Sequence, residues 1–427
     1  MSAAIIFVIL LVLMLTGMPI SISLGLTVLT FLFTMTQVPI ESVALKLFTG
    51  IEKFEIMAIP FFILAGNFLT HGGVARRMIN FATSMVGHWY GGLGLGGVMA
   101  CALFAAVSGS SPATVVAIGA ILLPAMVKQG FPNKFGAGVI TTSGALGILI
   151  PPSIVMVMYS VSTNTSVGAL FMAGVVPGLM LALFLGFTTW YRARKFDYPR
   201  QPKASALERL KAFKESAWGL FLIVVVMGGI YSGIFTPTEA AAMSAVYAFF
   251  VAVFVYKDLR MSDVPRVLLN SANMSAMLLY IITNAVLFSF LLTHENIPQQ
   301  MADFMIGTGV GVIGFLIMAN ILMLIAGNFM EPSSIVLILA PILFPIAIKL
   351  GIDPVHFGII MVVNMEVGMC HPPVGLNLYV ASGITKMGIT ELTVAVWPWL
   401  VSMLIFLVIV TYVPWISLAL PRALGMM

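Results

Sequence analysis

The sequence predicts an all-α integral membrane protein, and three observations lead to this class. Hydrophobic residues make up 60% of the 427 residues and charged residues only 8%, a balance that excludes a soluble globular protein. The apolar runs lack the alternation of polar and apolar residues that the strands of a membrane barrel require. Polar, proline-containing motifs interrupt several runs, and these motifs occur twice. We therefore expect many membrane helices, some of them discontinuous.

Apolar runs of helical length are distributed along the whole chain. Residues 37–55 mix charged and apolar positions, which predicts an amphipathic helix along the membrane interface. Residues 191–215 carry eight Lys or Arg and form the only long polar stretch. The apolar runs cover residues 3–16, 19–35, 57–70, 93–107, 112–127, 135–161, 168–190, 217–235, 239–256, 267–292, 311–329, 333–348, 355–383 and 393–419.

The two sides of this polar stretch look like repeats. Pro112 and Pro332, and the diprolines 151–152 and 372–373, are separated by 220 and 221 residues. We predict a first repeat over residues 1–190, with scaffold helices at 1–70, a hairpin at 93–127 and a broken helix at 135–161. A cytoplasmic basic linker follows at 191–215. The second repeat covers 216–427, with scaffold helices at 217–292, a hairpin at 311–348 and a broken helix at 355–383.

Each repeat contains a polar patch inside an apolar run, Ser108-Gly-Ser-Ser-Pro-Ala-Thr114 and Gly327-Asn-Phe-Met-Glu-Pro-Ser-Ser334. The apolar arms of the first patch are shorter than the roughly 20 residues of a membrane span. We interpret both patches as tips of re-entrant helical hairpins, with their polar groups satisfied inside the protein. With this trace, 16 of the 20 Lys and Arg lie on one side, which the positive-inside rule makes cytoplasmic. The repeats are then inverted, and both termini are periplasmic.

A second irregular element follows each hairpin, at residues 144–153 and 366–375. A diproline removes two backbone donors and ends a helix, so carbonyl oxygens become free near mid-membrane. Together with hydroxyls they are the ligands that hold Na⁺ in discontinuous transporter helices. Proline kinks that only shape the packing are the alternative. The predicted Na⁺ ligands are Ser108, Ser111, Gly147, Ile150 and Pro152 in the first half, and Gly327, Met330, Glu331, Gly368, Cys370 and Pro373 in the second.

The prolines also mark possible starts of half-helices whose positive ends converge on the centre, an arrangement that suits an anion. The central segments contain no Lys or Arg, so a bound carboxylate would depend on helix ends, Na⁺ and polar side chains. Helix capping is the alternative role for each Ser and Thr. The predicted substrate-binding residues are Ser110, Pro112, Thr114, Ser153, Pro332, Ser333, Ser334 and Asn377, and Pro152 and Pro373 are the other two possible helix starts.

A few ionisable residues lie in the apolar segments. For Glu331 we expect a cation ligand, with a structural hydrogen bond to backbone amides as the alternative, and for Glu366 both roles stay open. Thr236 and Glu239 predict a capping box. His371 has no acidic partner in the sequence around it, so we expect packing rather than proton transfer. Motifs of hydrolases, metalloproteases and ATPases are absent, so we expect no enzymatic activity and transport driven by an ion gradient.

Taken together, these motifs resemble one known family. The hairpins SGSSPAT and GNFMEPSS, the breaks GILIPPS and MCHPPVGLN, and the Thr236-Pro-Thr-Glu-Ala-Ala241 stretch are similar to the large membrane subunit of tripartite ATP-independent periplasmic (TRAP) transporters. The similarity covers essentially the whole chain. It implies an elevator-type fold of the ion-transporter superfamily in the bacterial inner membrane. It also implies uptake of an anionic organic acid, such as a C4-dicarboxylate or sialic acid, with Na⁺ as the coupling ion.

The resemblance further implies two protein partners. They are a soluble periplasmic substrate-binding protein and a small four-helix membrane subunit, which we expect on a separate chain. Membrane lipid is the remaining partner, and no nucleic acid is expected because the basic residues lie in loops between spans. The alternative is a self-sufficient ion-coupled carrier or antiporter that needs no binding protein. An integral membrane enzyme would need a polar catalytic pair, and the core offers only lone ionisable residues.

Overall fold

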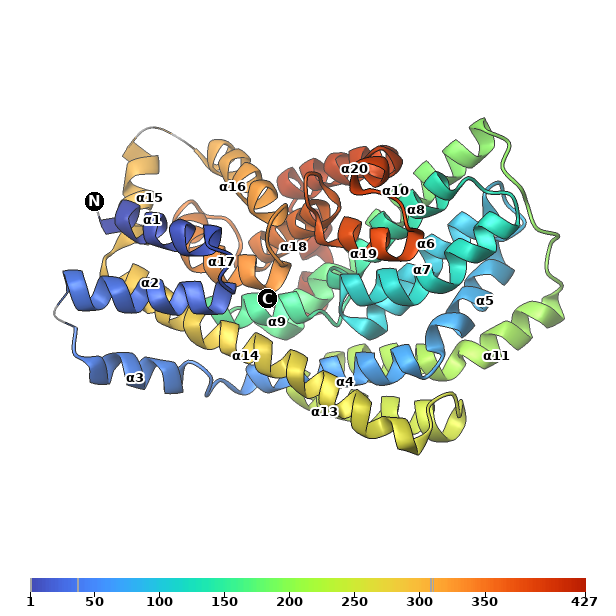
Figure 1. The fold of residues 1–427 in the computed structure, drawn as a ribbon, viewed down its shortest axis with the longest axis horizontal. Coiled ribbons are helices and arrows are strands. Elements are labelled where there is room, and N and C mark those ends of the chain that lie inside the picture. Colours follow the sequence, from blue (N-terminus) through green and yellow to red (C-terminus); the bar gives the residue numbers. More distant parts are fainter. Residues whose placement is uncertain (1, 37, 308, 310) are drawn as a thin grey trace.

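The structure is a computed structural model that describes residues 2–36, 38–307, 309 and 311–427. Every regular element in these ranges is a helix, which confirms the all-α class (Figure 1). In the first half the elements are α1 (Ser2–Leu15), α2 (Ile20–Met35), α3 (Ile40–Thr49), η1 (Phe54–Met57), α4 (Ala58–His71), α5 (Val74–Val86), α6 (Gly92–Ser108), α7 (Ser111–Lys128), α8 (Asn133–Ser143), η2 (Gly144–Ile148), α9 (Ile154–Thr163) and α10 (Val167–Lys195).

The second half repeats the order of hairpin, broken helix and long apolar helix. It begins with the helices that precede its hairpin and ends with one short helix after the last long one. Its elements are α11 (Ala206–Ile223), η3 (Val224–Gly228), α12 (Gly229–Tyr231), α13 (Pro237–Phe250), η4 (Val251–Val255), η5 (Met261–Asp263), α14 (Val264–His294), α15 (Ile297–Gly307), α16 (Val312–Gly327), α17 (Pro332–Lys349), α18 (Pro354–Cys370), α19 (Leu376–Thr385), α20 (Ile389–Tyr412) and α21 (Trp415–Ala423).

Eight helical stretches of the described chain are long and apolar enough to cross a membrane. The hairpin arms α7 and α17 have 18 residues each, as does Phe54–His71, and these are the shortest of the group, with a length of about 27 Å. Their partners α6 and α16 have 17 and 16 residues. All four are slightly short for a hydrocarbon core of about 30 Å. The eight stretches are Phe54–His71, Ser111–Lys128, Val167–Lys195, Ala206–Tyr231, Pro237–Val255, Met261–His294, Pro332–Lys349 and Ile389–Tyr412.

Several sequence-based boundaries are wrong. The interfacial helix expected over 37–55 is only α3, because Gly50 ends it and the chain is extended at Lys53; residue 37 lies outside the described residues. Residues 71–92, which lie between two of the predicted apolar runs, contain α5. This helix forms because Val74, Met78 and Ala82 recur at i+4 and are buried, while Arg76 and Arg77 on its other face pair with Asp258.

Two further differences concern the ends of long helices. The polar stretch 191–215 is non-helical only at 196–205, because α10 extends to Lys195 and a capping box of Ser205 and Glu208 starts α11. The run 393–419 is two helices, α20 and α21, separated at Pro414. The capping box expected at Thr236 and Glu239 is confirmed: the Thr236 N–H donates to Glu239 Oε2 at 2.8 Å, and the Glu239 N–H donates to Thr236 Oγ1 at 3.3 Å.

The hairpins and broken helices of the two halves pack across each other. Helix α9, which follows the first break, packs on α17 of the second hairpin, and α19, which follows the second break, packs on α7 of the first hairpin. Helices α3, α4, α13 and α14 run along the lower edge of Figure 1, beside this central group. The elements that carry the predicted site residues therefore meet in the interior of the molecule.

Candidate functional site

The first hairpin turns through only two residues, Gly109 and Ser110, between α6 and α7. Gly109 has φ +61°, a left-handed conformation that glycine adopts without a steric penalty. The hydroxyls around the turn partner one another: Ser108 Oγ lies 2.9 Å from Thr114 Oγ1, and Thr114 Oγ1 donates to Ser110 O at 2.8 Å. Ser108 and Thr114 thus stabilise the tip and point their oxygens toward each other.

The tip of this hairpin touches the first break. A Cβ atom on Gly147 would lie 2.6 Å from the carbonyl carbon and oxygen of Ser110, and one on Gly109 would lie 2.9 Å from Pro152 O. Both contacts are between backbones, so neither residue can gain a side chain without separating tip and break. Ser153 holds the break itself, because its hydroxyl donates to Ile148 O at 2.6 Å and accepts from Met156 N at 3.4 Å, as the N-cap of α9.

The second hairpin meets the second break in the same way. A Cβ on Gly327 would lie 2.9 Å from Gly368 Cα, so α16 and α18 are in backbone contact. In the amide orientation that satisfies its neighbours, Asn328 donates to His371 Nδ1 and His371 O at 2.9 Å and to Pro372 O at 3.0 Å. Asn328 O accepts from the Gly375 N–H at 3.2 Å. His371 thus has Asn328 as its hydrogen-bond partner, and the orienting or packing role expected of it stays a prediction.

The two glycines at the breaks occupy equivalent places. Gly147 and Gly368 differ by 221 residues, the same offset that relates Pro151 to Pro372. The Pro151–Pro152 and Pro372–Pro373 peptide bonds are both cis. Each glycine lies in a broken helix and lets the tip of the hairpin from its own half approach the backbone. The pairing of each hairpin with the break of its own half is therefore present in the structure.

One contact links the first hairpin to the second break. Asn377, in the first turn of α19, donates to Ser111 Oγ at 2.8 Å and to Thr141 O at 3.3 Å. Cys370 Sγ donates to the same Thr141 carbonyl at 3.4 Å. Ser111, Thr141, Cys370 and Asn377 are all buried. The second half thus supplies a side chain to the tip of the first hairpin, which the pairing by repeats did not predict.

Glu331 caps the helix that follows the second tip. As N-cap of α17, its Oε2 accepts from Ser334 N at 3.2 Å, and its Oε1 accepts from Ser333 Oγ at 2.7 Å. A carboxylate here also benefits from the positive end of the helix. The structural alternative for Glu331, a hydrogen bond to a backbone amide, is thus present; its role as a cation ligand stays a prediction.

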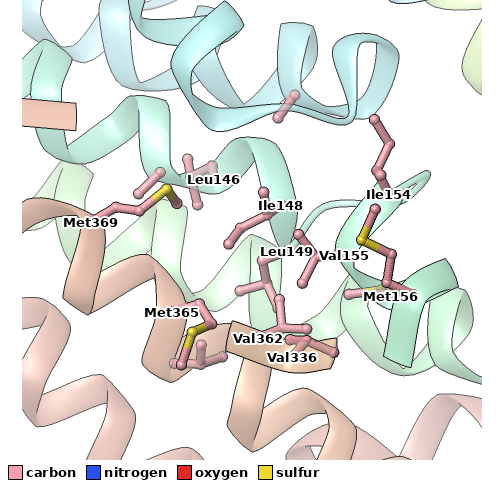
Figure 2. Packing of buried hydrophobic residues seen from close by; sticks show 14 of the residues in the cluster. Leu146, Ile148, Leu149, Ile154, Val155, Met156, Val336, Val362, Met365 and Met369 are labelled. Atoms are coloured by element: carbon pink, nitrogen blue, oxygen red, sulfur yellow. The ribbon is translucent and has the colours of Figure 1, made fainter. Parts of the chain in front are cut away.

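Glu366 differs from Glu331 because it has no such partners. The side chain is fully buried in α18, and neither carboxylate oxygen has a hydrogen-bond partner among the described residues. Figure 2 shows Val362, Met365 and Met369 of α18 facing Leu146, Ile148 and Leu149 of the first break.

Glu366 lies on the same face of α18 as Val362 and Met369, since it is four residues after one and three before the other. Its carboxyl group is therefore in an apolar contact between the two broken helices. A buried carboxylate without a partner is costly, so Glu366 is an additional candidate ligand for a cation.

The expected helix starts are only half right. Pro112 and Pro332 lie in the first turns of α7 and α17. Pro152 precedes the N-cap Ser153, and Pro373 precedes the N-cap Gly375, so neither diproline begins a helix. The chain is non-helical around each diproline. This lets Ser153 and the 371–375 loop turn back and form hydrogen bonds with neighbouring groups.

The other predicted residues lie less centrally. Ile150 packs against Gly178 of α10, and Pro373 is exposed. Ser110, Met330 and Glu331 are partly exposed beside the tips. Among the predicted residues that are partly exposed, these three lie at the hairpin tips and have oxygen atoms that a ligand can contact. The structure brings together Ser108, Ser110, Thr114, Gly147 and Pro152 at the first tip, Gly327 and Gly368 at the second, and Ser111, Cys370 and Asn377 between the halves.

The donor set at the tips consists of neutral oxygens and one or two carboxylates. Within the described residues, no three His, Cys, Asp or Glu side chains come together. Hydroxyl, amide and carbonyl oxygens are suited to a hard cation such as Na⁺, whereas a transition metal would call for His or Cys ligands. The residues present thus fit the coupling ion that the sequence predicts.

Sequence reasoning missed two residues. Asn328 lies between Gly327 and Met330, two of the predicted ion ligands. The offset of 220 residues that relates Pro112 to Pro332 also relates Ser108 to Asn328. Aligning the two tips would have found it. Thr141 contributes only its carbonyl, which accepts from both Cys370 and Asn377. Thr141 lies in the last turn of α8, where carbonyl oxygens lack partners within the helix, but no sequence signal identifies the donors that this carbonyl accepts from.

Comparisons with known proteins agree with this geometry. Residues 7–416 match the model of a family described as the tripartite ATP-independent periplasmic transporter, DctM component. The chain is 79% identical over 440 residues to the C4-dicarboxylate TRAP transporter large permease protein DctM of Rhodobacter capsulatus, with 100% of both chains covered. It is 37% identical over 410 residues to the sialic acid TRAP transporter large permease protein SiaM of Vibrio cholerae, with 96% of each covered.

A solved structure shares the fold. The crystal structure of the Alcanivorax borkumensis YdaH transporter superposes with a TM-score of 0.61 at 16% sequence identity, covering 92% of this chain and 90% of that one. At this identity the likeness concerns the fold alone.

Proposed function

Because the chain belongs to the DctM component family of tripartite ATP-independent periplasmic transporters, we propose that it is the large permease that carries C4-dicarboxylates into the cell. The relative at 79% identity is a C4-dicarboxylate permease, and relatives at lower identity include a sialic acid permease. A small anionic acid fits the tips, where helix starts at Pro112 and Pro332 and several hydroxyls face the breaks.

We propose that Na⁺ drives this uptake. The observation that carries the proposal is the contact of each polar hairpin tip with a broken helix in the protein interior, at Gly147 and at Gly368. Such contacts gather backbone carbonyls and hydroxyls into the kind of site that holds Na⁺ in discontinuous helices. The first site would use Ser108, Ser110 and Ser111, and the second Gly327, Glu331 and the chain near Gly368, with Glu366 as an additional carboxylate.

The two hairpins and the two broken helices would move together as the transport domain of an elevator. Their packing across the halves, α9 on α17 and α19 on α7, supports this because it joins them into one unit. Helices α2, α4, α13 and α14, which pack on one another, would be the static scaffold. In this proposal both hairpins are re-entrant, the repeats are inverted, and the chain lies in the inner membrane with both termini periplasmic.

The word tripartite in the family description supports two further components. We propose that a small membrane subunit on a separate chain stabilises the scaffold and that a soluble periplasmic binding protein delivers the substrate. The test is uptake of radiolabelled succinate into vesicles that contain this chain with its small subunit. Uptake is expected only with both an inward Na⁺ gradient and the loaded binding protein. Equal uptake of free succinate without the binding protein would indicate a self-sufficient carrier instead.

A reporter fused at residue 203 tests the topology. This position lies between α10 and α11, near the largest group of basic residues, and we expect it in the cytoplasm. A fluorescent protein that folds only in the cytoplasm should therefore be bright at this position, and a periplasmic phosphatase should be inactive. The opposite pattern would reverse the assigned orientation.

Ser111→Ala tests the first ion site. It removes the hydroxyl that pairs with Asn377, and a hydrogen bond of this kind contributes about 1 kcal/mol. We expect the Na⁺ concentration at half-maximal uptake to rise by about fivefold, with unchanged expression. Ser162→Ala is the matched control, since among the described residues that hydroxyl bonds only to the carbonyl of Met158 in its own helix. An unchanged sodium titration for Ser111→Ala would contradict the assignment.

A further inference from the structure

An apolar groove follows the membrane-facing side of α10. It lies between α5, α6 and α10, which are neighbours at one end of the molecule (Figure 1). Its walls include Leu95, Val98 and Met99 of α6 and Leu179, Leu183 and Gly186 of α10, and its volume is about 770 Å³. This volume is within the range of cavities that hold a small organic ligand.

One end of the groove lies beside a second cavity with a different lining. Trp89 and Trp190 line both cavities, so the two are adjacent. The second has a volume of about 460 Å³ and is lined in addition by His88, Tyr90, Arg194 and Arg200. Tryptophan and tyrosine at such a boundary are typical of the membrane–water interface. The groove therefore runs from an apolar interior to a basic, aromatic end.

The basic groups at this end lack anionic partners. Arg194 stacks over the Trp190 ring at 5.4 Å and Arg200 over the Tyr90 ring at 4.1 Å, and neither forms an ion pair with a described residue. His88 Nδ1 is a buried atom that has no hydrogen-bond partner in the described part of the chain. Three basic side chains that line this cavity, His88, Arg194 and Arg200, thus have unused capacity for an anion.

The dimensions fit a phospholipid. Leu179 and Trp190, at the two ends of the apolar part, are separated by eleven residues of α10, or about 17 Å. This is close to half of a hydrocarbon core of about 30 Å, the depth that one acyl chain reaches. Basic pockets between membrane helices on the cytoplasmic side are known to take anionic lipid head groups.

We propose that this groove is a binding site for one anionic phospholipid. Its phosphate lies among His88, Arg194 and Arg200, and an acyl chain lies between α6 and α10. Helix α6 is an arm of the first hairpin, so the lipid contacts an element whose far end forms the candidate ion and substrate site. The lipid composition of the membrane then affects transport through α6. The proposal does not depend on the identity of the transported substrate.

The test is native mass spectrometry of the purified full-length chain titrated with dioleoyl phosphatidylglycerol or dioleoyl phosphatidylcholine. The two lipids have the same tails, so a difference reports the head-group pocket. We expect phosphatidylglycerol to bind at least about tenfold more tightly, because each arginine near the head group contributes roughly fivefold. Arg194→Ala with Arg200→Ala should bring its affinity to that of phosphatidylcholine. Arg260→Ala with Arg266→Ala removes the same charge elsewhere and should change nothing.

Two further measurements test the parts of the site separately. Gly186→Trp fills the apolar groove, where a Cβ would have only Leu95 at 3.9 Å, and it should weaken the binding of both lipids. On the unmodified chain, high salt should weaken phosphatidylglycerol binding selectively. Equal binding of the two lipids would overturn the proposal. So would displacement of phosphatidylglycerol by the small membrane subunit, because the groove would then be a protein interface.

Discussion

Gly368→Ala is expected to abolish uptake while the chain still inserts and folds. The added Cβ meets Gly327, whose Cα is 2.9 Å away, and a backbone atom cannot rotate aside as a side chain can. Overpacking of this kind costs about 1–3 kcal/mol, which the hairpin tip relieves by moving away from the break. The second ion site is then open, so we expect uptake at saturating Na⁺ to fall at least tenfold.

Gly383→Ala is the matched control for this substitution. Gly383 is also helical, in α19, but a Cβ there has no neighbour within 4 Å, and alanine favours the helix. Gly147→Ala should reproduce the loss, because its Cβ meets the Ser110 backbone at the first tip. Thermal stability of the detergent-purified variants separates misfolding from lost function. Normal uptake by Gly368→Ala would show that transport does not require contact between the tip of the second hairpin and the broken helix α18.

Much of the central architecture could be predicted from the sequence, because proline and glycine act locally. A diproline breaks a helix whatever packs against it, so the interruptions near residues 151 and 372 follow from the chain alone. The hairpin turns are equally local, since Gly109 adopts a left-handed conformation and Pro112 and Pro332 begin the next helices. A repeat in the sequence then gives two copies of each feature.

The contacts that complete the site could not be predicted in this way, because they depend on how the halves pack. Asn377 belongs to the second half but pairs with Ser111 of the first. The two residues are 266 positions apart, and no local pattern relates them. Glu366 looks like any acid near a helix break until the structure places it without a partner among apolar side chains. Helix α5 was missed because Arg76, Arg77, Asn80, Thr83 and Ser84 interrupt its apolar positions, so no continuous apolar run marks it.

Glu331 is where the structural and the ion-binding interpretations can be separated by experiment. Its carboxylate accepts from Ser334 N and Ser333 Oγ, which makes it the N-cap of α17. Glu331→Gln keeps the length of the side chain and one acceptor oxygen but removes the charge. Glu331→Ala removes the acceptor as well as the charge. Loss of the cap lowers the free energy of unfolding by about 0.5–2 kcal/mol. Loss of a charged ligand weakens the binding of the cation by about 1.5–3 kcal/mol.

If Glu331 holds the ion, both variants should raise the Na⁺ concentration at half-maximal uptake by about 10- to 100-fold. Only Glu331→Ala should also lower the thermal midpoint, because glutamine still accepts the bond from the α17 backbone. Glu239→Gln is the control, since the Glu239 carboxylate also accepts a backbone N–H bond at a helix start, as the N3 residue of the capping box at the exposed start of α13. If Glu331→Gln leaves the Na⁺ concentration at half-maximal uptake unchanged, Glu331 serves as a helix cap and is not an ion ligand. The second ion site would then depend on the backbone near Gly327 and Gly368 and on Glu366, the buried carboxylate without a hydrogen-bond partner among the described residues.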